Sequence, residues 1–198
     1  MRYSNTHKQD TRRKVVRAAA AAVRAKGPDG VGVAAIMAEV GLTHGGFYAH
    51  FPNKEALVAA AVEEAFGQSR RRFSRMTEGM SPDQALTAFI DAYVSADHRN
   101  NPQRGCPIST LTNDLPRQGP LVRSAFDTGV ANLIARIEAW LPDQEPAQRR
   151  TLASSLTAEM AGAVALARAV FDQEMADALL DASRARIKAR AGLAEAAC

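Results

Sequence analysis

The 198-residue chain is poor in the features that define secreted, metal-binding or membrane proteins. It has two cysteines, Cys106 and Cys198, which are too few for a disulfide framework and favour a reducing cytoplasm. Two cysteines and four scattered histidines offer no metal-ligand spacing, so we expect no metal and no other cofactor. No apolar run of roughly 18 residues occurs, which predicts no membrane span. The basic, polar start MRYSNTHKQDTRRK argues against a secretory signal.

Composition and charge indicate a globular chain with one basic end. Hydrophobic residues make up 46% and charged residues 23%, which is typical of a folded protein and not of a disordered one. Residues 1–55 hold nine Lys or Arg against four Asp or Glu, whereas the rest holds sixteen against seventeen. A basic N-terminal quarter on a near-neutral body favours a polyanionic partner at that end.

Apolar residues recur at helical spacing along nearly the whole chain, as Val15, Val16, Ala19, Ala22 and Val23 do in the first segment. No alternating strand pattern interrupts them. We expect helices over residues 8–26, 33–40, 43–51, 54–75, 82–97, 108–115, 119–141, 147–170 and 173–191. The predicted fold class is therefore all-α with about nine helices, in an N-terminal domain of residues 1–69 and a C-terminal helical domain of residues 70–198.

Short local signals predict where several of these helices begin and end. Gly27 is expected to end the first helix in a left-handed cap, and Asn53 to cap the helix that follows it. The run Ser81-Pro82-Asp83-Gln84 combines a capping serine, a proline at the first helical position and a glutamine at the capping-box position.

The stretch GLTHGGFYAHFPNKEAL, residues 41–57, places Gly45 and Gly46 inside a short aromatic segment. Each glycine costs a helix roughly 1 kcal/mol relative to alanine. Residues 33–51 nevertheless have the pattern helix, glycine turn, short helix, which is the helix-turn-helix arrangement whose second helix enters the DNA major groove. Gly41 permits the tight turn, and the two later glycines remove bulk where a backbone approaches a duplex closely.

The second helix of this motif carries most of the candidate DNA contacts. Phe47 and Phe51, four residues apart, are predicted to anchor it in the core, and Thr43 to cap it. Lys54 adds a cation beside the free N–H groups of the next helix, which suits a phosphate. The predicted DNA-contact residues are Thr43, His44, Gly45, Tyr48, His50 and Lys54, of which the threonine, histidines and tyrosine are expected to face outward.

This stretch closely resembles the DNA-binding signature of TetR-family transcriptional regulators in its glycine turn, outward Thr, paired aromatics, His-Phe and Lys-Glu-Ala-Leu. The first helix fits as well, because RKVVRAAAAAVRAKG has the family's basic start, Ala-Ala pair and terminal glycine. The resemblance covers about residues 9–69; beyond them only length and helical architecture agree. One departure is GVGVAAI, where Val33 and alanines replace the family's phosphate-contacting threonine.

The resemblance implies a homodimer formed through the last two helices. These helices are long enough for an intermolecular four-helix bundle, and the small residues of AEMAGAVALARA, residues 158–169, allow close approach. Two-fold symmetry would place the two recognition helices about 34–36 Å apart on a pseudo-palindromic double-stranded operator.

The resemblance also implies an apolar pocket in the C-terminal domain for an unidentified small-molecule effector. Cys106 lies in RGCP between two helices, where the nearby Arg104 and a helix N-terminus favour the reactive thiolate, and some TetR-like regulators sense quinones, aldehydes or oxidants through a cysteine near this point. An inert buried thiol is the alternative. The candidate effector-binding residues are Phe89, Tyr93, Cys106, Leu111, Phe126 and Met160.

The sequence thus predicts a non-enzymatic, sequence-specific repressor that a small molecule or a thiol-reactive electrophile releases from its operator. An activator is equally compatible with the residues. One alternative is an architectural DNA-binding protein without an effector. Another is an enzyme with Cys106 as nucleophile and His98 as base, for which no third orienting group is evident. Lys8, Arg12 and Arg13 could attract DNA non-specifically or serve only solubility.

Overall fold

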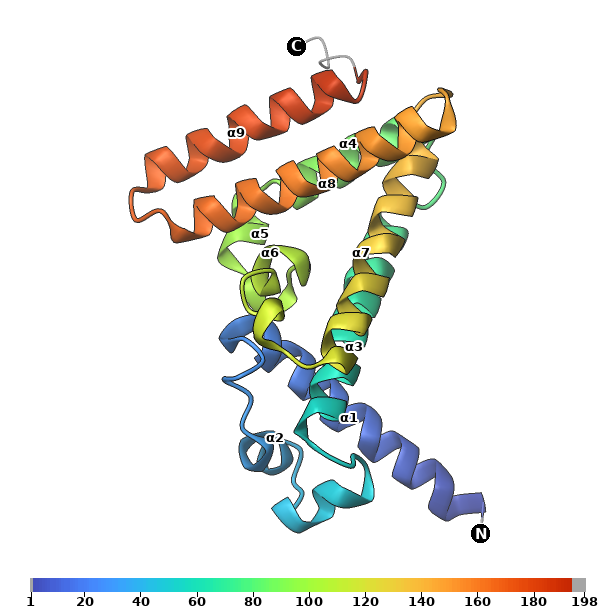
Figure 1. The fold of residues 1–198 in the computed structure, drawn as a ribbon, viewed down its shortest axis with the longest axis vertical. Helices are drawn as coiled ribbons and strands as arrows, with labels where there is room; N and C mark the ends of the chain where they lie inside the picture. The colour runs from blue at the N-terminus through green and yellow to red at the C-terminus, as the bar shows by residue number, and fades with distance from the viewer. Residues whose placement is uncertain (1, 194–198) are drawn as a thin grey trace. The chain divides into compact units, whose positions relative to one another are not determined.

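The computed structural model describes residues 2–193, and these contain helices and no strand (Figure 1). The α-helices are α1 Arg2–Lys26, α2 Val33–Glu39, α3 Lys54–Met76, α4 Pro82–Tyr93, α5 Ala96–Asn100, α6 Ile108–Leu111, α7 Pro120–Trp140, α8 Pro146–Ala169 and α9 Gln173–Arg190. Three 3-10 helices are η1 His44–Ala49, η2 Pro102–Arg104 and η3 Leu115–Arg117. The all-α prediction is confirmed. Cys198 lies outside the described residues.

Packing divides the chain into two compact units. The N-terminal unit consists of residues 1–69 and 106–129, and the C-terminal unit of residues 70–105 and 130–198. Residues 106–129 therefore group by contact with the N-terminal helices. The functional domain boundary at residue 70 remains a prediction.

The core of the N-terminal unit is built on the apolar stripe of α1. Val15, Ala19 and Val23 are fully buried, as their helical spacing predicts, and side chains from α2, η1, α3 and the segment that contains α6 and the start of α7 complete the cluster. Arg24 is also buried, because its guanidinium donates to the Ala65 carbonyl at 3.3 Å and to the Gln68 side-chain carbonyl at 2.7 Å. These bonds join α1 to α3.

Three predicted helix ends with a local signal are confirmed. Gly27 has a φ of 73° in the left-handed region, where a side chain would be strained. The Asn53 carboxamide oxygen accepts from the Ala56 N–H at 2.8 Å. At the start of α4 both bonds of the capping box between Ser81 and Gln84 are present.

Several predicted helices differ from the structure. The first begins at Arg2 and not at Lys8, and the helix expected over residues 108–115 ends at Leu111. The recognition segment forms a 3-10 helix of six residues, because its two glycines favour α-helix poorly and its bonds close three residues apart. The helix expected over residues 82–97 ends at Tyr93, and Ser95 begins the separate helix α5 by accepting from the His98 N–H. At this break the Val94 carbonyl accepts from Arg184 of α9 at 3.1 Å.

In the C-terminal unit α8 and α9 lie side by side, joined by residues 170–172 (Figure 1). Their buried faces include Leu156, Met160, Val164, Leu180 and Ile187. A second cluster is aromatic and comprises Phe73, Phe89, Tyr93, His98 and Trp140. No helix within residues 2–193 is both long enough and apolar enough to cross a membrane.

Candidate DNA-binding surface

Two buried phenyl rings hold the recognition segment η1 in place, as predicted. Phe47 and Phe51 are each 2% exposed, and their rings stack with centroids 5.7 Å apart and planes inclined by 24°. The Gly46 N–H donates to the Thr43 carbonyl at 3.1 Å, which closes the first 3-10 turn. The segment is therefore fixed by packing and does not need to be stable as an isolated helix.

The turn between α2 and η1 depends on Gly41, whose φ is 75°. The Gly41 N–H donates to the Ala38 carbonyl at 3.0 Å, and the Leu42 N–H to the Met37 carbonyl at 2.9 Å. These bonds use the terminal carbonyls of α2 and set the direction in which the chain leaves it. At the other end of α2 the capping residue is Gly32, which supplies no side-chain bond.

The pair Gly45 and Gly46 is not explained by crowding within the chain. A Cβ atom at position 45 would meet nothing within 4 Å, and one at position 46 would reach Met37 and Thr43 at ordinary contact distances of 3.7 and 3.9 Å. Neither residue has a positive φ. The fold itself would therefore tolerate alanine at both positions.

Three of the predicted DNA-contact side chains are exposed on η1 or immediately before it. Tyr48 is 68% exposed, and its ring meets those of Phe47 and His44 edge-on at 5.2 and 6.5 Å. His44 is exposed as well. Thr43 occupies the capping position as predicted and is exposed, but its side chain makes no capping hydrogen bond.

His50 and Lys54 differ in part from the expectation. His50 is half-buried, not outward-facing, and its Nδ1 atom is buried without a hydrogen-bond partner among the described residues. Burial, together with the positive charges of Lys8 and Arg12, lowers the pKa of His50 below its usual value of 6.5. Lys54 is exposed at the start of α3, and its Nζ donates to the Asp29 carbonyl at 3.2 Å.

Comparisons with known proteins agree with this geometry. Residues 15–61 match the sequence profile of "Bacterial regulatory proteins, tetR family". A solved TetR transcriptional regulator from Chloroflexus aurantiacus J-10-FL is 27% identical with a TM-score of 0.75, and the alignment covers 93% of this chain and 95% of that one. The chain belongs to the TetR family of transcriptional regulators.

Other TetR-type structures share the fold of this TetR-family protein. Reduced E. coli NemR has a TM-score of 0.75 at 20% identity, over 91% of this chain and 96% of that one. A TetR-family regulator from Cytophaga hutchinsonii has a TM-score of 0.74 at 22% identity, over 92% and 96%. No curated protein sequence matches the chain. The protein is a DNA-binding transcriptional regulator with an N-terminal helix-turn-helix.

The predicted effector-binding residues of this TetR-family protein fall in both units. Phe89, Tyr93 and Met160 are fully buried in the C-terminal unit. In the N-terminal unit Leu111 is fully buried, Phe126 is partly buried with its ring 5.7 Å from that of Phe66, and Cys106 is 2% exposed. Their role in effector binding remains a prediction.

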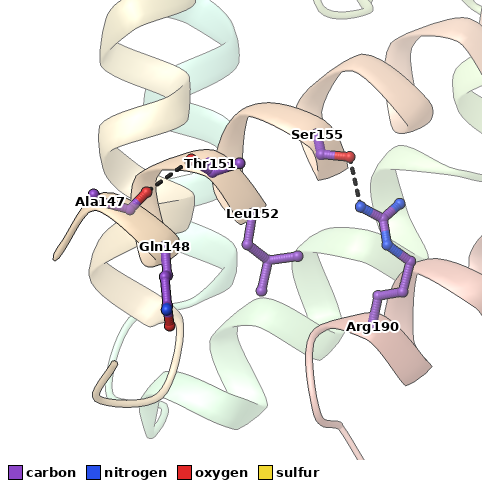
Figure 2. A pocket seen from close by; sticks show the side chains of 6 residues that line it. All are labelled: Ala147, Gln148, Thr151, Leu152, Ser155 and Arg190. Atoms are coloured by element: carbon purple, nitrogen blue, oxygen red, sulfur yellow. Dashed lines mark hydrogen bonds between the residues drawn. The ribbon is translucent and has the colours of Figure 1, made fainter. Parts of the chain in front are cut away.

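A hollow of about 450 Å³ lies on the C-terminal unit of the TetR-family chain (Figure 2). It is lined by none of the six predicted effector residues. Within it the Arg190 guanidinium donates to the Ser155 hydroxyl, and the Thr151 hydroxyl to the Ala147 carbonyl. The lining residues are Ala147, Gln148, Thr151, Leu152, Ser155 and Arg190.

Several polar interactions in this TetR-family fold were not predicted from the sequence. Arg168 of α8 donates to the His98 and Arg99 carbonyls, both at 3.0 Å, and the buried Arg99 guanidinium donates to Asp177 of α9 at 2.7 Å. In the N-terminal unit the Arg12 guanidinium lies 4.8 Å above the Phe51 ring centroid. The spacing in the sequence places Arg12 on the same helix face as Val16, four residues later, but does not identify Phe51 as its partner.

Proposed function

We propose that this TetR-family protein is a homodimeric, ligand-responsive repressor of the cytoplasm that a small molecule releases from its operator. The observation that carries the proposal is the exposed polar face of η1, which the buried phenyl rings beneath it hold in position. The proposed operator contacts are Thr43, His44, Gly45, Tyr48, His50 and Lys54.

This face offers the groups that read a duplex. The hydroxyls of Thr43 and Tyr48 and the ring of His44 can donate hydrogen bonds to base edges or phosphates. The open space beside Gly45 supports close approach of the η1 backbone to DNA, because nothing inside the chain requires a glycine there. Lys54 uses one of its three N–H donors on Asp29, which leaves donors for a phosphate and holds the ammonium group close to the turn before α2.

Exposed apolar stripes on the last two helices support a second copy of the chain as the partner. Along α9 an exposed alanine or methionine recurs every three or four positions, with exposed charged residues such as Asp181 and Arg186 between them. Such 3-4 spacing of apolar residues forms a seam that packs against another helix, and small side chains let the backbones approach closely. The stripe residues are Ala158, Gly162, Leu166 and Ala169 on α8, and Met175, Ala178, Ala182, Ala185 and Ala189 on α9.

An effector needs only a modest preference to release the operator. The two recognition segments of a dimer bind together only when their spacing matches one helical turn of DNA. A ligand that binds the wrongly spaced state more tightly by a few kcal/mol would shift the population to that state. Apolar side chains such as Phe126, which is partly buried, support an apolar or aromatic ligand.

Thiol-reactive electrophiles are the second proposed effector class. The sequence supplies one cysteine between helices, Cys106, and the similar E. coli NemR structure is described as a reduced form. Cys106 is only 2% exposed, so an electrophile would reach its sulfur through a local opening of the 105–108 segment. Reaction there would add bulk to a packed site and so destabilise the packing around Cys106.

The rival functions have less support. An enzyme with His98 as base is disfavoured, because burial lowers the pKa of His98 to about 4 and its Nδ1 is bonded to the Tyr93 carbonyl at 2.7 Å. An architectural protein would bind all duplexes alike, whereas a regulator should prefer its site by at least about 10³. Activation and repression differ in where the operator lies relative to the promoter.

Substitutions on η1 test the proposal. Thr43→Ala and Tyr48→Ala should each weaken binding to the operator by about tenfold or more, because each removes contacts worth about 1–3 kcal/mol, and both variants should remain dimeric. Thr128→Ala, an exposed threonine of α7, is the matched control and should bind like the wild type. Unchanged affinity in both η1 variants would refute the assignment of this face.

A further inference from the structure

The first turns of α1 carry cations in the register of its apolar stripe. Counting back from Ala20 and Val16 in steps of four leads to Arg12 and then to Lys8. Ala20 and Val16 are buried, whereas Arg12 and Lys8 are exposed. The face of α1 that packs on the N-terminal unit therefore continues, toward the N-terminus, as a pair of positive charges.

These two cations lie at the end of the recognition segment. The Arg12 guanidinium sits over the ring of Phe51, which holds η1 in the core, with 4.8 Å from its central carbon to the ring centroid. Both Lys8 and Arg12 are close enough to lower the pKa of His50, the residue that follows η1. A flat, delocalised guanidinium on an aromatic ring keeps its N–H edge available to another partner.

No acidic side chain among the described residues forms an ion pair with Lys8 or Arg12. The nearest carboxylate in sequence, Asp10, is bonded to Arg13 instead. Both cations are exposed and lack a counter-charge in the described part of the chain, and both destabilise a protonated His50. An anion between them would reduce their mutual repulsion. The geometry thus favours an anionic ligand at this end of η1.

We infer that Lys8 and Arg12 form a phosphate-binding site for the DNA backbone, beside the segment that contacts the bases. The inference rests on the proposed function of η1, because it places the bound phosphate on the same duplex. A DNA phosphate suits the site better than a free phosphate ion, since both side chains are solvent-exposed and lack the enclosure that holds a small anion. The site would fix the register of η1 on the duplex and carry no base preference.

The salt dependence of DNA binding tests this site. Affinity for a mixed-sequence duplex several helical turns long would be measured at a series of salt concentrations for the wild type, Lys8→Ala, Arg12→Gln and Lys14→Ala. Lys14 is an exposed lysine on the same helix, about 200° around the axis from Arg12, so it controls for the removal of one charge. Thermal unfolding would show whether Arg12→Gln disturbs its contact with Phe51. Among the described residues, Lys8 makes no such ring contact.

We expect Lys8→Ala to lower the magnitude of the slope of log K against log salt by about 0.9 for each phosphate that the variant no longer neutralises, and Lys14→Ala to change it much less. Lys8→Ala and Arg12→Gln slopes equal to that of Lys14→Ala would overturn the site while leaving the η1 face intact. Absence of wild-type binding to this duplex and to the proposed operator at low salt would overturn the site and the proposed function together.

Discussion

At the scale of single residues, Gly45 and Gly46 differ in what a methyl group would meet. Gly45→Ala would place its methyl in open space, whereas Gly46→Ala would place it against Met37 and Thr43. We expect Gly45→Ala to raise the free energy of unfolding by about 0.4–1 kcal/mol, because alanine has less conformational freedom to lose. The same change should weaken operator binding, since the methyl would stand between η1 and the duplex.

Chemical denaturation and DNA titration of both variants separate these effects. Gly46→Ala is the matched control and should retain more of the DNA affinity, because its methyl packs inside the chain. A Gly45→Ala protein that is more stable and binds the operator unchanged would show that the glycine pair is not there for DNA.

His98 makes the stability of the C-terminal unit depend on pH. Burial, the largest cause, lowers the pKa of His98 from 6.5 to about 4, so the fold holds the neutral ring. The buried neutral ring of His98 contributes fully to the free energy of unfolding above pH 6.5. This contribution is lost as the pH falls toward 4, since the unfolded chain then binds the proton more readily than the folded chain. The loss between pH 7 and pH 5 should be about 2 kcal/mol.

Urea denaturation of the wild type and His98→Phe at the two pH values measures this effect. His98→Phe keeps a ring against Gly105 but cannot ionise, so the difference in unfolding free energy between pH 7 and pH 5 should shrink. The variant will start from a lower stability because it lacks the bond to the Tyr93 carbonyl. If the variant and the wild type lose the same unfolding free energy between pH 7 and pH 5, His98 does not cause the pH dependence.

At the scale of helices, the exposed stripe of α9 is the element that the proposed dimer depends on. Ala182→Glu places a charge in the middle of this stripe and should convert the dimer to a monomer, because a carboxylate cannot be buried there without a partner. Ala139→Glu, at an exposed alanine of α7, is the matched control. Sedimentation velocity should find Ala182→Glu monomeric and Ala139→Glu dimeric; two dimers would contradict this interface.

Helix ends set by neighbouring residues were predictable, and those set by distant ones were not. The capping box of Ser81 and Gln84 and the left-handed Gly27 depend on a few adjacent residues. The end of α4 instead involves Arg184, ninety residues away, which bonds the Val94 carbonyl. Similarly, the outward face of η1 followed from its pattern, but the half-burial of His50 depends on packing.

At the scale of the whole molecule, the sequence carried more information on the DNA-binding part than on effector recognition. The helix-turn-helix is a local motif, so residues 33–51 predicted its two helices and its turn. The grouping of residues 106–129 with the N-terminal helices is a long-range effect, in which Leu111 and Leu115 join the core built on α1. The lining of an effector pocket depends on such packing and could not be derived from spacing alone.

We propose that this TetR-family protein recognises a particular DNA sequence and releases it on binding an effector. The most direct test is a fluorescence-anisotropy titration of the purified protein with DNA from immediately upstream of its own coding sequence, against an unrelated duplex of equal length at two salt concentrations. We expect the protein to prefer its operator by at least about 10³. An added effector, with electrophiles screened first, should abolish this preference. Equal, salt-sensitive binding to the upstream DNA and to the unrelated duplex, with the same result for DNA from the neighbouring promoters, would contradict sequence-specific recognition.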